Sequence, residues 1–181
     1  MTNLPFDSSF SLIVGVGASA GGLEAFRELL KGLGDAPTMA IVFIQHLEPS
    51  SKSLLTELLT KTTRMNVVEL SGQMLLTAGA VYVCPPQTLL ELKKGIVSCC
   101  ESDDQRQVGA IDHFFHSVAE DQRERGIGVI LSGTGSDGTL GLKAISDQGG
   151  LTLAQDAESA KYDSMPRSAA TTGVADHVLS P

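Results

Sequence analysis

Three turns in this sequence carry side chains whose types and spacing could support catalysis, and the first of them surrounds Ser19. Gly17-Ala18-Ser19-Ala20-Gly21 matches Gly-x-Ser-x-Gly, a turn that exposes a serine hydroxyl between a strand and a helix. The glycines relieve crowding where the backbone reverses. A helix beginning near Gly21 would direct free N–H groups and a partial positive charge toward the same point. Ser19 is therefore a candidate nucleophile with donors nearby for an oxyanion.

The same stretch also fits a dinucleotide-binding pattern, because residues 15–20 read Gly-x-Gly-x-x-Ala. Such a site needs Asp or Glu at the end of the next strand to hold the ribose. That strand ends Ile44-Gln45-His46, which begins the second of the three turns, and the first acid after it is Glu48. A neutral imidazole suits a general base for a serine better than a ribose ligand. His46 therefore favours catalysis, although a small-residue turn that only packs a helix against a sheet remains an alternative.

The third turn, Ser132-Gly133-Thr134-Gly135-Ser136-Asp137-Gly138, supplies a carboxylate. Asp137 could accept an imidazole N–H and so fix the tautomer of a catalytic histidine. It could instead cap the helix that begins near Gly138. The glycines could also form a phosphate-binding nest, but no lysine follows as it does in a P-loop.

Hydrophobic periodicity places these turns at strand ends. Short apolar runs typical of buried strands alternate with segments of helical spacing, which predicts an α/β fold with a mainly parallel sheet flanked by helices. The strand runs begin near residues 11, 39, 126 and 151. Residues 66–108 contain short β-type runs, and Lys93-Lys94-Gly95 predicts a hairpin, so we expect a β-hairpin-rich insertion in the middle. Sites in such sheets lie beyond the carboxyl ends of the strands.

Length and composition exclude several classes of protein. The 181 residues suit one domain, with residues 1–10 expected as a loose lead-in and 11–181 as the domain. The net charge of −8 and the absence of Trp argue against a nucleic-acid partner. No apolar run reaches the ~18 residues of a membrane helix, and the N-terminus lacks the pattern of a signal peptide, so we expect a cytoplasmic protein without membrane insertion. Cys84, Cys99 and Cys100 have spacing that indicates neither a disulfide framework nor a zinc site.

The three turns described above, together with further stretches of the sequence, resemble the catalytic domain of the CheB family of protein-glutamate methylesterases. The resemblance is greatest to the version fused to CheR-type methyltransferases. The resemblance covers roughly residues 11–180, in the order of the family. The matching stretches are residues 14–25, 45–47, 81–86, 130–141, 154–156 and 164–169.

The resemblance implies a doubly wound domain in which Ser19, His46 and Asp137 form a Ser-His-Asp triad. It implies hydrolysis of glutamate γ-methyl esters on chemoreceptor cytoplasmic helices or similar signalling proteins, with methanol released and no cofactor or metal required. Some members also deamidate glutamines. The likeness to the fused version allows for a CheR-type methyltransferase domain in the same polypeptide as a partner. A nucleotide-binding or non-catalytic docking module of a larger signalling protein is the alternative.

Backbone N–H groups of Ala20 and Thr134 are the expected oxyanion donors, the first because it follows the nucleophile. Many stand-alone members of the family have Met at the position of Thr134. They also carry an N-terminal receiver domain that is absent from these residues, so the resemblance carries no expectation of control by phosphorylation.

Overall fold

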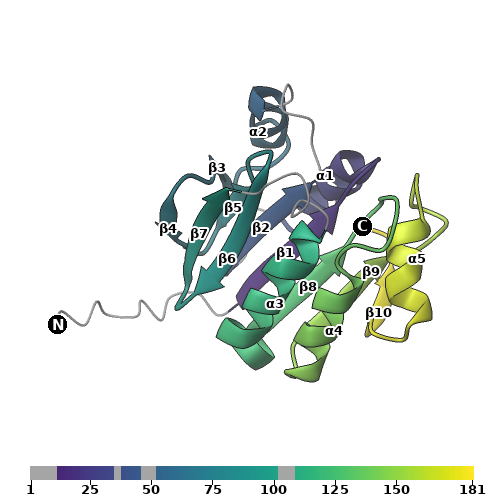
Figure 1. The fold of residues 1–181 in the computed structure, drawn as a ribbon. Coiled ribbons are helices and arrows are strands. Elements are labelled where there is room, and N and C mark those ends of the chain that lie inside the picture. The colour runs from purple at the N-terminus through teal and green to yellow at the C-terminus, as the bar shows by residue number, and fades with distance from the viewer. Residues whose placement is uncertain (1–11, 35–37, 46–51, 102–108) are drawn as a thin grey trace.

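The computed structural model describes residues 12–34, 38–45, 52–101 and 109–181, and its centre is a seven-stranded sheet (Figure 1). The strands of this sheet are β1 (Leu12–Ala18), β2 (Met39–Gln45), β3 (Asn66–Glu69), β5 (Ala80–Val83), β8 (Gly126–Ile130), β9 (Leu151–Gln155) and β10 (His177–Leu179). Their order is β10-β9-β8-β1-β2-β5-β3, and every neighbouring pair is parallel. The carboxyl ends of β1, β2 and β8 therefore meet at one edge, with β1 in the middle.

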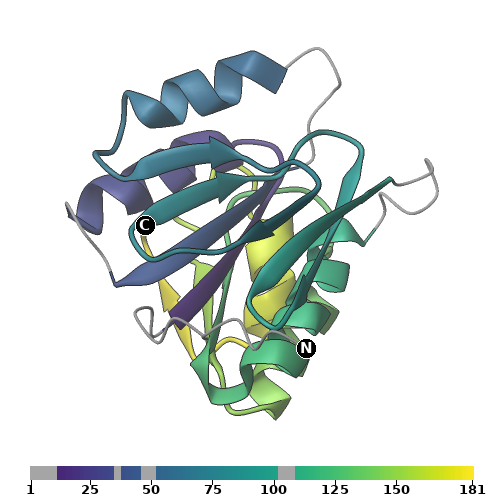
Figure 2. The same cartoon turned by 90° about the vertical axis from the view of Figure 1, so that its left-hand side faces the viewer.

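Helices cover both faces of this sheet (Figure 2). They are α1 (Gly22–Gly32), α2 (Lys52–Thr60), α3 (Ala110–Gln122, extended by a 3-10 turn at Arg123–Arg125), α4 (Thr139–Asp147) and α5 (Ser164–Thr171). One core contains buried side chains of α3, α4 and α5, and the other contains those of α1 and α2. The predicted doubly wound arrangement is confirmed.

The strand β2 shows why the apolar runs are continuous rather than alternating. Ala40, Val42 and Ile44 belong to the core beneath α3, while Ile41 and Phe43 belong to the core beneath α1. Because each face is covered by helices, both sets of side chains must be apolar. The ring of Phe43 stacks on a ring of α1, that of Phe26, with centroids 4.0 Å apart.

The predicted insertion is present but smaller than residues 66–108. It is a three-stranded antiparallel sheet of β4 (Gln73–Leu75), β7 (Ile96–Glu101) and β6 (Thr88–Lys93), in that order. Lys94 and Gly95 form the predicted hairpin turn with φ of 55° and 73°, the left-handed conformations of a type I′ turn. The other short runs of this region, β3 and β5, instead extend the main sheet.

Two further details differ from the sequence prediction. The sequence predicts a helix over Pro166 to Thr172. In the structure this helix begins two residues earlier, at Ser164, which places the proline in the first turn where its missing N–H costs no hydrogen bond. The short strand β10 was not predicted, because three exposed residues show no burial pattern. The lead-in at residues 1–10 lies outside the described residues.

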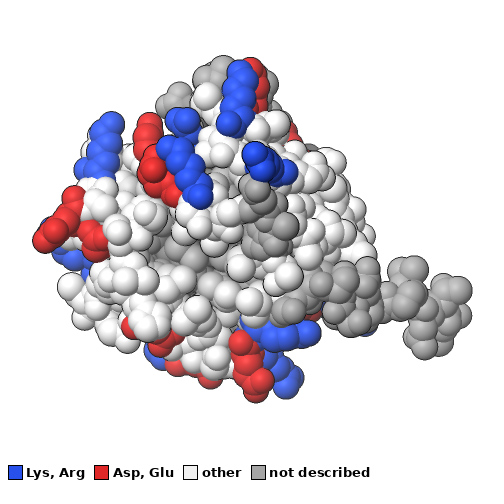
Figure 3. All heavy atoms as spheres, turned by 180° about the vertical axis from the view of Figure 1, so that it is seen from behind, with Lys and Arg blue, Asp and Glu red and all other residues white. Residues whose placement is uncertain are grey.

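Acidic and basic side chains lie next to one another on the surface (Figure 3). Lys31 pairs with Glu28 on the exposed face of α1, and Lys61, directly after α2, pairs with Glu57 of that helix, each at 2.6 Å. Exposed pairs of this kind contribute only about 0–1 kcal/mol. Within the described residues, no helix combines the length and the apolar character that crossing a bilayer requires.

We predict that Asp176→Asn destabilises the protein by about 1 kcal/mol near pH 7, because this carboxylate attaches the segment before the edge strand β10 to the neighbouring strand β9. Its Oδ2 atom accepts hydrogen bonds from the Thr152 hydroxyl (2.7 Å) and the Thr152 N–H (2.9 Å), which lower the pKa of Asp176. A lowered folded-state pKa gives stability that is present above about pH 4 and is lost as the pH falls through the folded value.

Chemical denaturation at several pH values measures this difference. The gap between the parent protein and Asp176→Asn should shrink as the pH falls below about 4. Glu120→Gln, at an exposed acid on α3, is the matched control and should change the free energy of unfolding little. A gap that stays constant down to pH 2 would contradict the assigned role of the carboxylate.

Candidate active site

The turn that carries Ser19 is held in place by main-chain hydrogen bonds. Ser19 directly follows β1, and its N–H donates to the carbonyl of Ser132 at 3.1 Å. Its own carbonyl accepts the N–H of Gly22 at 3.0 Å as α1 begins. Gly21, at the N-cap, has a φ of 72°, a left-handed conformation that glycine adopts without strain. The turn therefore places the partly exposed Ser19 at the carboxyl edge of the sheet and beside the N-terminus of a helix, as the sequence predicted.

The loop after β8 lies directly against this turn. A Cβ atom added to Gly133 would lie only 2.9 Å from Cβ of Ser19 and 2.8 Å from Cε of Met165. Glycine is thus required where the strand ends approach each other. This contact brings the loop of Thr134 and Asp137 to the turn of Ser19.

Ser132 is a residue of this site that sequence reasoning did not single out. It is fully buried, its Oγ donates to the Ala20 carbonyl at 2.9 Å, and the same Oγ accepts the Tyr162 N–H at 3.0 Å. Its N–H donates to the side chain of Gln155 at 2.8 Å. One hydroxyl therefore joins the β1 turn to the segment before α5. A serine at a strand end beside three glycines offered a weak signal for this role.

The strand β2 contributes Gln45, the residue before His46. The Gln45 side-chain amide donates to the Ser19 carbonyl at 3.2 Å, so the end of β2 is fastened to the same turn. His46 itself lies outside the described residues.

The carboxylate of Asp137 lies at the start of α3. Its two oxygens accept the N–H groups of Ile111 (3.2 Å) and Asp112 (3.1 Å). Asp137 therefore does cap a helix, but it caps α3 and not the helix expected near Gly138; Gly138 forms the N-cap of α4 without a side-chain bond. A negative charge at the positive end of α3 is favourable.

The side chain of Ile111 separates the Asp137 loop from the strand that leads to Ser19. A Cβ atom added to Gly17 would lie 2.4 Å from Cγ2 of Ile111, and one added to Gly138 would lie 2.7 Å from the same atom. The two glycines are far apart in the sequence, and both therefore pack on the same buried side chain. Ser19 lies two residues after Gly17, and Asp137 directly precedes Gly138. The shared contact with Ile111 thereby brings both residues to the carboxyl ends of the same strands.

A second acid, Asp112, stands beside Asp137. Its Oδ1 accepts the N–H of Gly141 at 2.7 Å, which joins α3 to α4. Burial raises the pKa of Asp112, and the negative charge of Asp137 raises it further, while the Gly141 N–H and His116 act in the opposite direction. Two carboxylates thus concentrate negative potential at this end of α3.

The two expected oxyanion donors are the N–H groups of Ala20 and Thr134. Each directly follows one of the two residues, Ser19 and Gly133, at which the turns contact each other. The Ala20 carbonyl is fixed by Ser132, and no described residue accepts a hydrogen bond from the Ala20 N–H. Thr134 is exposed in the loop directly after Gly133. The N–H of Gly133 is already used, since it donates to the Tyr162 carbonyl at 2.9 Å.

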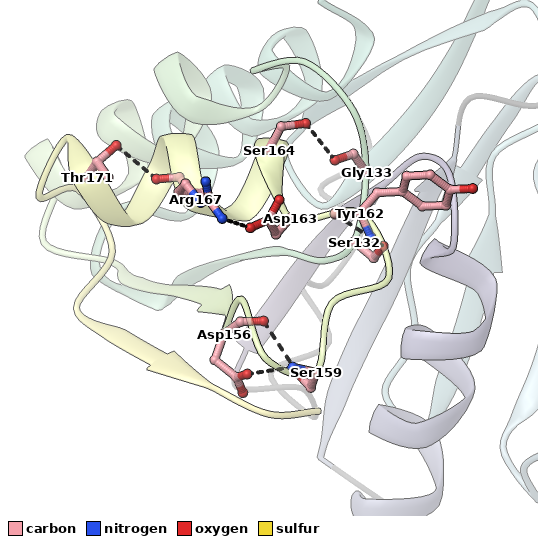
Figure 4. Close-up of polar contacts among 9 residues, drawn as sticks. All are labelled: Ser132, Gly133, Asp156, Ser159, Tyr162, Asp163, Ser164, Arg167 and Thr171. Carbon is pink, nitrogen blue, oxygen red and sulfur yellow. Dashed lines mark hydrogen bonds and ion pairs between the residues drawn. The ribbon is translucent and has the colours of Figure 1, made fainter.

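The segment from Asp156 to α5 closes one side of this arrangement (Figure 4). The Asp156 carboxylate accepts the Ser159 N–H at 2.8 Å, which shapes the loop after β9. The Ser164 hydroxyl donates to the Gly133 carbonyl at 3.3 Å at the start of α5. Arg167 pairs with Asp163 on the exposed side of the helix.

The three cysteines form no disulfide. Cys84 is buried, and burial raises its pKa to about 12, so the thiol stays protonated at neutral pH and is a poor nucleophile. Among the described residues, no three His, Cys, Asp or Glu side chains group as metal ligands.

Known proteins are similar to this chain in sequence and in fold. The family model described as CheB methylesterase matches residues 14–181. The crystal structure of the Thermotoga maritima CheB methylesterase catalytic domain has a TM-score of 0.84 and 31% sequence identity, covering 93% of this chain and 92% of that chain.

Two curated relatives are longer than this chain. Protein-glutamate methylesterase/protein-glutamine glutaminase 1 of Carboxydothermus hydrogenoformans is 34% identical over 174 residues, which are 92% of this chain and 51% of that protein. A Rhodobacter capsulatus protein named "Uncharacterized 104.1 kDa protein in hypE 3'region" is 40% identical over 125 residues, which are 69% of this chain and 13% of that protein. The chain thus spans about half the length of the first relative and a small part of the second. Because the family model matches nearly the whole described fold, and a catalytic domain of the same fold is similar over 93% of the chain, this chain belongs to the CheB methylesterase family.

Proposed function

We propose that this domain hydrolyses glutamate γ-methyl esters on chemoreceptors or related signalling proteins and releases methanol. The observation that carries the proposal is the setting of Ser19, in a turn joined by hydrogen bonds to the ends of both neighbouring strands. Membership of the CheB methylesterase family supports the choice of substrate. The alternative of a nucleotide-binding module is not favoured, because β2 ends in Gln45 without the acid that a ribose needs.

In this mechanism Ser19 Oγ attacks the side-chain ester carbonyl while His46 accepts the hydroxyl proton. The tetrahedral intermediate collapses, the bond to the methoxy oxygen breaks, and His46 returns the proton so that methanol leaves. Water then attacks the glutamyl-serine ester with His46 again as base, which frees the glutamate carboxylate and restores Ser19. A positioned base of this kind contributes about 10²–10⁴-fold.

Asp137 would fix the tautomer of His46 and stabilise the imidazolium that forms in each step. Hydrogen bonds from two N–H groups of α3 hold its carboxylate in one orientation. The N–H groups of Ala20 and Thr134 would stabilise the oxyanion, and one such donor contributes about 10²–10³-fold.

The same acyl-enzyme could form from a glutamine side chain, with ammonia leaving in place of methanol. The name of the Carboxydothermus relative includes both activities. We also propose a cytoplasmic location and a working context within a longer polypeptide, such as one with a CheR-type methyltransferase domain. The Rhodobacter relative supports the second point, since the matched region is 13% of that protein.

We predict that Ser19→Ala abolishes methanol release from a methylated chemoreceptor, because no oxygen remains to form the acyl-enzyme. The hydrogen bonds that fasten the turn use main-chain atoms of Ser19, so the variant should fold. Methanol is measured by gas chromatography, and circular dichroism reports the fold. Ser146→Ala, in the last turn of α4 at the opposite edge of the sheet, is the control. Full activity of Ser19→Ala would remove this serine from the role of nucleophile.

We predict that Asp137→Asn lowers kcat by about 10³–10⁴-fold, because the imidazole tautomer is no longer fixed. It should also destabilise the protein by about 1–2 kcal/mol, because the neutral amide accepts the α3 N–H groups less well. Asp147→Asn, at an exposed acid of α4, provides the comparison for both steady-state kinetics and thermal denaturation. Loss of stability with an unchanged kcat would show that Asp137 is a helix cap alone.

A further inference from the structure

We propose that Tyr162 contacts the protein segment that carries the ester and so selects among methylated sites; this inference rests on the proposed function. The ring is unusual for this chain because it is exposed. Of the aromatic side chains in the described residues, the four phenylalanines are fully buried and Tyr82 is 3% exposed, whereas Tyr162 is 43% exposed. An exposed aromatic at a fixed position is typical of an interaction site.

The main chain of Tyr162 is fixed at both of its polar atoms. Its N–H donates to Ser132 Oγ at 3.0 Å, and its carbonyl accepts the N–H of Gly133 at 2.9 Å. The Ser132 hydroxyl that accepts the first bond donates in turn to the carbonyl of Ala20, the residue after Ser19. Tyr162 is therefore held against the nucleophile turn by its backbone, and its side chain is not needed for that attachment.

The ring lies beside the turn of Ser19. A Cβ atom added to Gly21 would lie 3.3 Å from Cδ2 of Tyr162, and Gly21 is two residues from Ser19. Figure 4 shows the ring pointing away from α5. The Lys161 Nζ lies 6.0 Å from the ring centroid, so a cation borders the same surface. A substrate chain that delivers an ester to Ser19 would pass this exposed ring.

The chemistry of the ring indicates what it would select. In a helical substrate the residues three and four positions from the esterified glutamate lie on the same face as that side chain. An aliphatic residue at one of these positions could pack on the Tyr162 ring when the ester reaches Ser19. The ring has only two side-chain torsions and a fixed backbone, so it loses little conformational entropy on contact. We therefore expect a preference for glutamyl esters with an aliphatic neighbour one helical turn away.

The test uses two helical peptides that carry one glutamate γ-methyl ester. The first has Leu three and four residues on either side of the ester, and the second has Ala at those positions. The parent protein should hydrolyse the Leu peptide with a kcat/KM about 5–20-fold higher, as expected for one aromatic contact. Tyr162→Ala should remove this preference by lowering kcat/KM about 5–20-fold more for the Leu peptide than for the Ala peptide, while Tyr162→Phe should keep it.

Leu151→Ala is the matched control, since Leu151 is an exposed apolar residue at the amino end of β9, whereas the candidate site lies at the carboxyl ends of the strands. An equal loss on both peptides in Tyr162→Ala would overturn the inference, because it would assign the ring to the structure of the turn. An unchanged preference in that variant would overturn it as well.

A binding measurement separates this inference from the proposed function. The chain has no Trp and only two Tyr, and Tyr82 is buried away from any peptide, so a change in tyrosine fluorescence when a peptide binds reports on Tyr162. In the Ser19→Ala background the Leu peptide should change this fluorescence at a lower concentration than the Ala peptide. If the parent protein hydrolyses neither peptide nor a methylated chemoreceptor, the proposed function fails; if it is active and the two peptides bind Ser19→Ala equally, only the inference fails.

Discussion

The arrangement of the candidate site depends on how closely the end of β8 can approach the turn after β1. Ser132 and Gly133 make this approach possible in two different ways. The buried Ser132 hydroxyl bonds to the main chain on both sides, at Ala20 and at Tyr162, while Gly133 leaves space for Cβ of Ser19. A larger residue at position 133 would separate the strand ends, and an apolar residue at position 132 would leave buried polar groups without partners.

At the N-terminus of α3, the capping of the helix and the orientation of the Asp137 carboxylate depend on the same hydrogen bonds. Its first N–H groups need acceptors, and the Asp137 carboxylate supplies them from another loop. The same bonds hold that carboxylate in one orientation, which a residue that orients a catalytic histidine requires. Capping and catalysis, which the sequence presented as alternatives for Asp137, are therefore compatible in the folded protein.

Much of the fold could be predicted from local patterns. Continuous apolar runs such as Met39–Gln45 identify strands buried on both faces, and the Lys94-Gly95 turn identifies the hairpin, because both signals arise from short-range geometry. The pairing of β3 and β5 with β2 could not be predicted in this way. Short strands of similar composition can join either sheet, and only the packing of the whole chain decides which.

For the candidate site, the sequence by itself determined which residues have suitable chemistry and that they follow strands, since Gly-x-Ser-x-Gly and a glycine-rich loop with Asp137 are local features. The tertiary structure alone decided that Asp137 caps α3, that Ser132 joins two loops, and that Tyr162 lies exposed beside the Ser19 turn. The hydrogen bonds of Asp137 and Ser132 to these partners connect residues 25 to 112 positions apart along the chain. Their partners are chosen by the order of strands in the sheet, and no local pattern carries that information.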